Sequence, residues 1–584
     1  MSQFRYSSLK SSRAIRLLRF LHEPGTEPVC QMITVEVEKA PPFVALSYTW
    51  GAKENSRAIL VDDAVIPITK NLGEAIDAIS PYVMERSMMF WADSICINQA
   101  DIDERSRQVR LMNTIYRSAE IVAIWLGLAE DDSDLAFDMM MEWKPRFDVL
   151  SEQCGGDNHL AMSTISPEDP FFFGLSGSKE RRAHEALCRL SRRQWWTRAW
   201  VVQEGTVAYR ARTVLFCGDR STDWDYIRTV LWIRYAKNDH NFNPDDRFMT
   251  DLDDLRGTRE YGTNIKLLRL LHLMRMYECE DPHDKVYAAL GMAMDVHEND
   301  IIPDYTKTCA EVYTDVAKFC ISNPSNQPFD FLSYAVRSAP GTSLEFDHNP
   351  LLPSWIPDWT ICADLRPLDK ECYYGSKLQH HGTFNACAAL SGEYHFDHRT
   401  LQVQGSVLDR ITQVMTVCDC AIIEGGLDIV RSWAPPNPQE PYLLGQTKLE
   451  AYNHTIFADI GETKTGYNWD MSRGFAMDWE LTDRASVLKT PEELDRHYRM
   501  MTDLDNTTFA RRMFVTSCGF MGLGPAAAQV GDSVCVLLGG QLLYVLRGGD
   551  DGKFEFVGEC YVHGMMDGKA CEEPWFLKRD FVLV

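Results

Sequence analysis

The sequence lacks several features that would assign it directly to a class of protein. No stretch approaches the roughly 18 apolar residues that a membrane-spanning helix needs. A formal net charge of −25 opposes binding to a nucleic-acid backbone, and no compact basic patch offsets it. The 17 cysteines are scattered, without the close spacing of a zinc site. We therefore expect no membrane span, nucleic-acid partner, metal or cofactor, and a cytoplasmic protein with reduced cysteines.

The N-terminus allows two interpretations. Residues 1–22 contain basic and serine residues but no acid before Glu23, which is the composition of a mitochondrial presequence. However, AIRLLRFL at 14–21 alternates in polarity and is followed by the strand-like MITVEV at 32–37. The alternation favours an opening β-hairpin.

The stretch from 90 to 126 predicts a strand, a helix and a second strand in close succession. Residues 90–97 are apolar and β-prone, and 121–126 form a branched apolar run closed by Gly127. Between them Val109, Met112, Ile115 and Tyr116 recur at helical spacing, and a polar face is expected from Asp103, Glu104, Arg105, Arg107 and Arg110. A β-α-β unit implies a parallel sheet.

The pattern divides the chain into three parts. Residues 1–235 predict an α/β domain with a parallel sheet, containing a helix after Asn71 and a surface loop at 151–179. Residues 236–400 predict a mainly helical middle region, in which Asp281 would cap a helix. Residues 401–584 predict a β-rich domain, an antiparallel sheet or small barrel, interrupted by an irregular insertion at 425–490. His563 stands at a strand-to-turn junction, where it is expected to bond the backbone.

Several blocks carry a family resemblance. They are VALSYTWG at 44–51, the segment 91–130 and RRQWWTRAWVVQE at 192–204. In this order they resemble the fungal heterokaryon incompatibility (HET) domain, and later segments resemble those that accompany it in full-length members. The resemblance implies nonself recognition during cell fusion and the triggering of regulated cell death.

The same blocks remotely resemble Toll/interleukin receptor domains. Trp200 and Glu204 match the Trp-Cys-x-x-Glu motif of that family in spacing, although Val201 replaces the cysteine and Arg198 stands where serine is common. Many members hydrolyse NAD at the nicotinamide glycosidic bond, so the resemblance implies NAD as substrate and Glu204 as the catalytic residue. A fixed carboxylate near the ribose would stabilise an oxocarbenium-like centre. From spacing alone, the favoured interpretation of Glu204 is a surface residue paired with Arg198 or Arg193.

A substrate pocket is predicted where two parallel strands end on the same edge of the sheet. The candidate substrate-binding residues are Ser47, Tyr48, Trp50, Asp93, Asn98 and Trp200. Two structural alternatives stay open: strand alternation explains 45–51 without a ligand, and Asn98 with Asp101 could supply a helix cap and a first-turn acid.

The sequence thus predicts an incompatibility effector at 1–235 that is restrained or positioned by the rest of the chain. A non-catalytic signalling or assembly module, or a pathway regulator that does not kill, are the alternatives. Because the chain has no repeat array or nucleotide-binding switch, protein partners would supply the sensing, with self-assembly as a further expectation.

Overall fold

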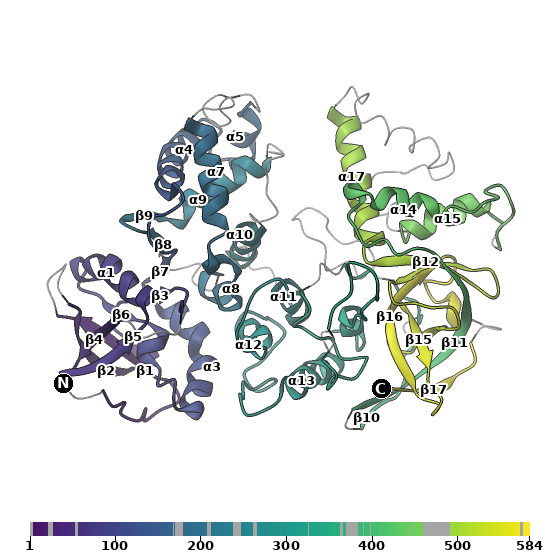
Figure 1. Cartoon of the computed structure of the whole chain (residues 1–584), viewed down its shortest axis with the longest axis horizontal. Coiled ribbons are helices and arrows are strands. Elements are labelled where there is room, and N and C mark those ends of the chain that lie inside the picture. The colour runs from purple at the N-terminus through teal and green to yellow at the C-terminus, as the bar shows by residue number, and fades with distance from the viewer. Residues whose placement is uncertain are drawn as a thin grey trace. The chain divides into compact units, whose positions relative to one another are not determined.

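The computed structural model divides into two compact units, Met1–Lys307 and Thr308–Val584 (Figure 1). It describes residues 4–584 with the exception of 22–26, 53–56, 167–168, 170–178, 207–211, 237–246, 261–264, 325, 348, 363–365, 369–383, 389, 398, 444, 460–490 and 573–575. Among the described residues, no helix combines the length and apolarity that crossing a membrane requires.

The first unit is built on a nine-stranded sheet in the order β5-β4-β2-β1-β6-β3-β7-β8-β9. Its strands are β1 (Ala14–Phe20), β2 (Val29–Glu36), β3 (Phe43–Ser47), β4 (Arg57–Val61), β5 (Ala64–Ile68), β6 (Met89–Trp91), β7 (Ile121–Trp125), β8 (Arg212–Cys217) and β9 (Arg220–Asp223). β3 pairs in parallel with β6 and β7, and β7 with β8. The predicted parallel sheet is confirmed for these strands, but the whole sheet is mixed, because β1–β2, β4–β5 and β8–β9 are antiparallel pairs.

The order of the parallel strands creates a crevice. Along the chain they come as β3, β6, β7 and β8, whereas in the sheet they lie as β6-β3-β7-β8. The connections therefore change direction between β3 and β7, whose residues are all buried. In open α/β sheets, ligands bind outside the carboxyl ends of the strands at such a switch point.

The local predictions in this region were partly correct. β1 and β2 form the expected N-terminal hairpin, and α3 (Ile102–Ser118) is the expected helix, capped by Asp101. The strand expected over 90–97 is wrong beyond Trp91, because Asp93–Cys96 forms the short helix α2, with Ser94 N–H donating to the Asp93 carboxylate at 2.7 Å. Glu104 was also misplaced on a polar face.

Glu104 is in fact part of a buried ion pair. Both its carboxylate oxygens accept hydrogen bonds from the guanidinium of Arg16 on β1, at 2.6 and 2.9 Å. The two side chains are only 3% and 1% exposed. The same carboxylate accepts the backbone N–H of Asn98 at 2.7 Å, so it joins β1, α3 and the loop between α2 and α3.

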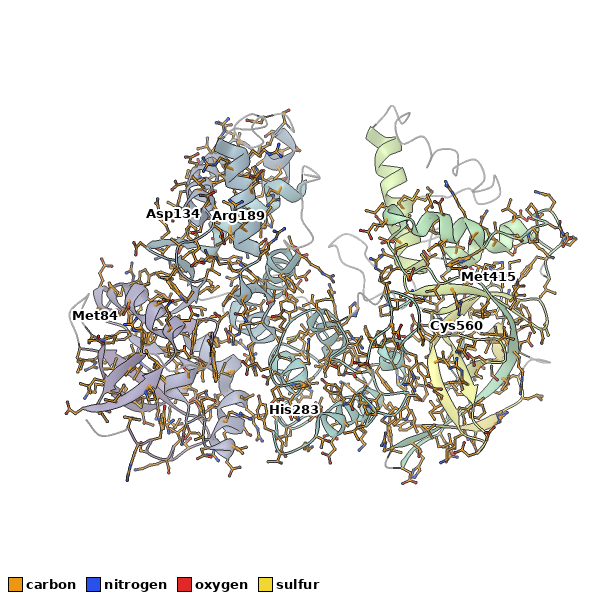
Figure 2. All side chains as sticks on the ribbon, viewed as in Figure 1. Met84, Asp134, Arg189, His283, Met415 and Cys560 are labelled. Atoms are coloured by element: carbon orange, nitrogen blue, oxygen red, sulfur yellow. The ribbon has the colours of Figure 1, made fainter. Side chains whose placement is uncertain are left out.

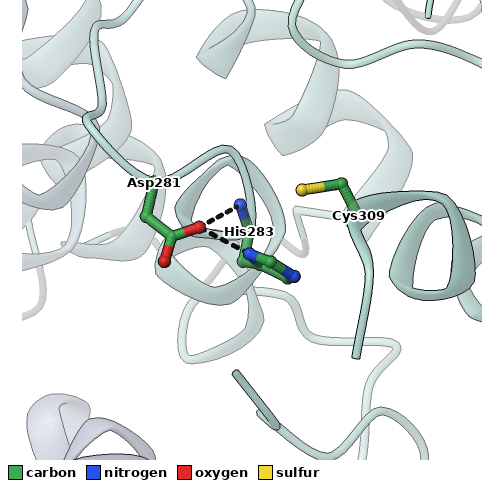
Figure 3. Close-up of side chains that lie close together, drawn as sticks. All are labelled: Asp281, His283 and Cys309. Atoms are coloured by element: carbon green, nitrogen blue, oxygen red, sulfur yellow. Dashed lines mark hydrogen bonds and ion pairs between the residues drawn. The ribbon is translucent and has the colours of Figure 1, made fainter. Parts of the chain in front are cut away.

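Helices complete the first unit. They include α1 (Lys70–Glu85), α4 (Ser133–Gln153), α5 (Asn158–Thr164), α7 (Lys179–Ser191), α8 (Ala199–Thr206), α9 (Trp224–Ala236), α10 (Arg247–Glu260), α11 (Leu267–Met274) and α12 (Asp284–Leu290). The loop predicted at 151–179 is wrong where α4 ends and α5 forms; most of 167–178 lies outside the described residues. Before α12, Asp281 accepts the backbone N–H of His283 at 3.2 Å and pairs with its ring Nδ1 at 2.5 Å (Figure 3). The predicted cap at Asp281 is wrong, because α12 begins at Asp284 and its N-cap residue is His283.

The second unit contains α13 (Cys309–Ser322) and a closed antiparallel barrel. The described strands are β10 (Tyr394–Asp397), β11 (Thr400–Val414), β12 (Arg511–Thr516), β13 (Met521–Pro525), β14 (Ser533–Leu537), β15 (Leu543–Gly548), β16 (Phe554–Val562) and β17 (Arg579–Leu583). The β11–β14 pairing closes the ring β11-β12-β13-β16-β15-β14. The predicted β-rich domain is thereby confirmed.

The predicted irregular insertion at 425–490 is partly helical. It contains α14 (Gly426–Ser432) and α15 (Lys448–Ile456), and α17 (Pro491–Thr508) follows it. α15 begins with a reciprocal cap, in which Thr447 and Glu450 satisfy each other's backbone N–H groups. Residues 460–490 lie outside the described part of the chain.

Candidate functional site

A cavity of about 610 Å³ opens at the switch point of the first sheet. Thr49 follows β3, Leu126 and Gly127 follow β7, Asn71 comes from α1, and Trp195 completes the lining. Its walls carry both signs of charge: Lys70, Arg189, Arg192 and Arg193 lie beside Glu74, Glu130 and Asp131. Figure 2 labels Arg189, which α7 contributes. The lining suits a polar ligand with anionic groups.

Glu204 lies behind this cavity on α8. It is 4% exposed, and its carboxylate accepts a hydrogen bond from the Ser47 hydroxyl at the end of β3. Ser47 Oγ in turn accepts the indole N–H of Trp195 at 2.8 Å. Trp195 lines the cavity, whereas Glu204 and Ser47 do not. A chain of hydrogen bonds thus connects the cavity wall to a buried carboxyl group.

The environment of Glu204 shifts the ionisation of its carboxyl group toward neutral pH. Burial raises its pKa from 4.5 to about 7, against the opposing effects of the Arg198 charge and the Ser47 hydrogen bond. The interpretation of Glu204 as a surface residue is wrong. Arg193 instead donates to the backbone carbonyls of Leu126 and Leu128, and Arg198 donates to that of Tyr48.

A second polar cluster joins the ends of β3 and β6. The Trp50 indole N–H donates to the Asp93 carboxylate at 2.8 Å. The Tyr48 hydroxyl donates to Ser94 Oγ at 2.6 Å. Burial raises the pKa of Asp93, although Arg198 and the Trp50 hydrogen bond act in the opposite direction. Tyr48, Trp50 and Asp93 therefore meet at one edge, as neighbouring parallel strands require.

The two other predicted residues have different surroundings. Asn98 lies beyond α2 and its backbone binds Glu104, while the cap of α3 is Asp101. Trp200 is half-buried on α8, where its side chain hydrogen-bonds Asp284. Burial raises the pKa of Asp284 to about 6. None of the six predicted substrate-binding residues is among those that line the cavity: Ser47, Tyr48, Trp50, Asp93, Asn98 and Trp200 all lie outside its lining.

Sequence reasoning missed Asn71 and Tyr116 as supports of the site. The Asn71 amide donates to the Thr49 carbonyl at 2.6 Å and accepts the Trp125 indole N–H at 3.0 Å, which ties α1 to the ends of β3 and β7. The Tyr116 hydroxyl on α3 donates to the Leu46 carbonyl at 2.9 Å. Single residues in helices that contact a strand from afar leave no periodic signal in a sequence.

Comparisons with known proteins match both units. Residues 43–204 match the family model of the heterokaryon incompatibility protein (HET), and residues 476–584 match that of the Het-6 β-barrel domain. The first match begins at the start of β3 and ends at Glu204. The chain is 25% identical over 668 aligned positions to heterokaryon incompatibility protein 6, OR allele, of Neurospora crassa. The alignment covers 95% of this chain and 93% of that protein. No solved structure matches the chain.

Proposed function

Since this chain belongs to the fungal heterokaryon incompatibility proteins and acts in nonself recognition, we propose that its N-terminal unit is a cytoplasmic effector that triggers cell death by hydrolysing NAD. The reaction would take place in the switch-point cavity. The observation that carries this proposal is the hydrogen-bonded chain from Trp195 through Ser47 to Glu204.

The topology supports a Toll/interleukin receptor-like fold for this effector. The parallel strands lie in the order β6-β3-β7-β8, which is second, first, third and fourth along the chain. This is the order of flavodoxin-like doubly wound sheets, which bind nucleotides at the same switch point. Lysine and arginine side chains around the cavity would take the pyrophosphate of NAD.

The chemistry needs one ionised carboxylate near the ribose. The bond between the ribose C1′ and the nicotinamide nitrogen breaks, and nicotinamide leaves as a neutral ring. The positive charge that develops on the sugar is stabilised by the Glu204 carboxylate, and water adds to give ADP-ribose and a proton. A pKa of about 7 leaves a large share of Glu204 ionised at cellular pH.

The geometry also suggests how the effector would be held inactive. Trp195 lines the cavity, whereas Glu204 is only 4% exposed and is connected to Trp195 through Ser47. In this proposal the Trp195 and Ser47 side chains must move before Glu204 can meet the ribose. Self-assembly at high protein concentration would supply that movement, and a protein partner would promote it.

A non-catalytic assembly module is the second candidate. It is favoured by the same burial, because a carboxyl group held by Ser47 could serve packing alone. In that case the charge of Glu204 would be irrelevant to signalling.

Expression in fungal cells separates these candidates. We expect residues 1–307 to be at least as toxic as the full chain, because this compact unit contains the whole cavity. Glu204→Gln should abolish toxicity, while Glu120→Gln, at an exposed carboxylate outside the cavity lining, should retain it. Full toxicity of Glu204→Gln would contradict the enzymatic proposal and favour assembly. If toxicity requires the barrel, the N-terminal unit is not a self-sufficient effector.

A further inference from the structure

The second unit contains a cluster of metal-ligand side chains that lies outside the proposed effector site. His454 comes from the last turn of α15, Asp459 from the turn after it, and His563 from the turn that follows β16. One potential ligand atom of each residue lies within 4.8 Å of the other two. Segments separated by more than a hundred positions are thus brought together by folding.

We propose that His454, Asp459 and His563 bind a divalent transition-metal ion, with zinc as the best match. Two imidazole nitrogens and one carboxylate oxygen form a ligand set that zinc uses in proteins, with water or another group in the fourth position. The proposal is independent of the function proposed for the N-terminal unit.

The distances are compatible with a small ion. Tetrahedral zinc with bonds of about 2.0–2.1 Å holds its ligand atoms roughly 3.4 Å apart. His563 Nδ1 lies 3.7 Å from an Asp459 oxygen. His454 Nδ1 lies 2.5 Å from the other oxygen of Asp459, so this pair would separate by about 1 Å on binding. Asp459 lies in the turn that follows the helix, so a rotation of its side chain can provide this shift.

The orientation of His563 supports the assignment. Its Nε2 lies 2.8 Å from Gln446 Oε1, an acceptor, so Nε2 carries the proton. Nδ1 then presents its lone pair toward Asp459. Metal-binding histidines usually donate their second ring N–H to such an oxygen, which fixes both the tautomer and the ring. The expected hydrogen bond from His563 to the backbone is therefore wrong: its ring contacts are with side chains.

Neighbouring side chains provide a candidate fourth ligand and hold the cluster together. The Tyr561 hydroxyl donates to Asp459 and lies 3.1 Å from His563 Nδ1, close enough to become a fourth ligand. The rings of His454 and His563 stack with centroids 4.8 Å apart. Polar groups from His454, Tyr561 and His563 thus already surround the Asp459 carboxylate.

Metal content of the purified full-length chain tests the proposal. After treatment with a chelator and dialysis against zinc, the wild-type protein should retain about one zinc per chain, measured by elemental mass spectrometry. Asp459→Asn and His454→Gln should lose it, and His395→Gln, at an exposed histidine on β10, should keep it. Cobalt substitution should give the visible absorption of a four-coordinate site in the wild type, and this absorption should be absent from Asp459→Asn and His454→Gln.

A second variant guards against loss of metal through misfolding. Gln446→Ala removes only the partner of the His563 ring, so the fold should persist while zinc affinity falls 10- to 100-fold. No zinc retention by the wild type, or equal retention by Asp459→Asn, would overturn the assignment. Unchanged affinity in Gln446→Ala would overturn the role given to His563.

Discussion

The charge of Glu204 makes a quantitative prediction for stability. Its carboxyl ionises near pH 4.5 in the unfolded chain, and burial raises its pKa to about 7 in the folded protein. Between these values the folded state binds more protons than the unfolded state, so the free energy of unfolding falls as pH rises. At about 1.4 kcal/mol per pKa unit, the total loss of unfolding free energy is about 3 kcal/mol. It is absent below about pH 4 and complete above about pH 7.5.

The substitution Glu204→Gln removes this titration while keeping a side chain that can bond Ser47. We expect the variant to gain about 2–3 kcal/mol relative to wild type as pH rises from about 5 to about 8. Urea unfolding of both proteins across this range measures the difference. Glu130→Gln, at an exposed carboxylate, should run parallel to wild type. Parallel curves for Glu204→Gln and wild type would refute the buried, proton-binding state of Glu204.

Two further substitutions, the second with a control, test the buried ion pair of the first unit and the closure of the barrel in the second. Glu104→Gln leaves the buried guanidinium of Arg16 without its countercharge, so urea unfolding should show a loss of about 3–5 kcal/mol. A loss below about 1 kcal/mol would mean that the pair is solvated. Gly405→Ala would place its Cβ against the Val536 carbonyl on the neighbouring strand, so the barrel should lose about 3 kcal/mol or more. Gly552→Ala, in an open turn with positive φ, should cost only about 1 kcal/mol. Equal melting temperatures for the two glycine variants would contradict the β11–β14 closure.

The sequence predicted the elements that have strong periodicity. The apolar runs at 121–126 and the helix after Asp101 were recognisable because each buries a regular face. The end of β6 was not recognisable, because the segment ADSIC at 92–96 fits a strand as well as it fits the short helix that it forms. Glu104 was placed on the polar face because its partner, Arg16, is 88 positions away in the sequence.

The same limit applies to the candidate sites. The spacing of Trp200 and Glu204 singled out the carboxyl group, but its contacts with Ser47 and the role of Trp195 depend on how β3 and α8 pack. The histidines of the second unit were not predicted as ligands, since His454 and His563 share no local motif. Pairings between distant segments carry no signature in a single sequence.

The most direct test of the proposed function is nicotinamide release from NAD by the purified protein. The N-terminal unit is incubated with NAD at high protein concentration, at pH values between about 6 and about 8, and the products are separated by chromatography. Nicotinamide and ADP-ribose should form at a rate that rises as Glu204 ionises through about pH 7. Glu204→Gln should lower this rate by orders of magnitude, and Glu120→Gln, at an exposed carboxylate outside the cavity lining, should leave it unchanged. No cleavage by the wild type, or equal cleavage by Glu204→Gln, would contradict the account.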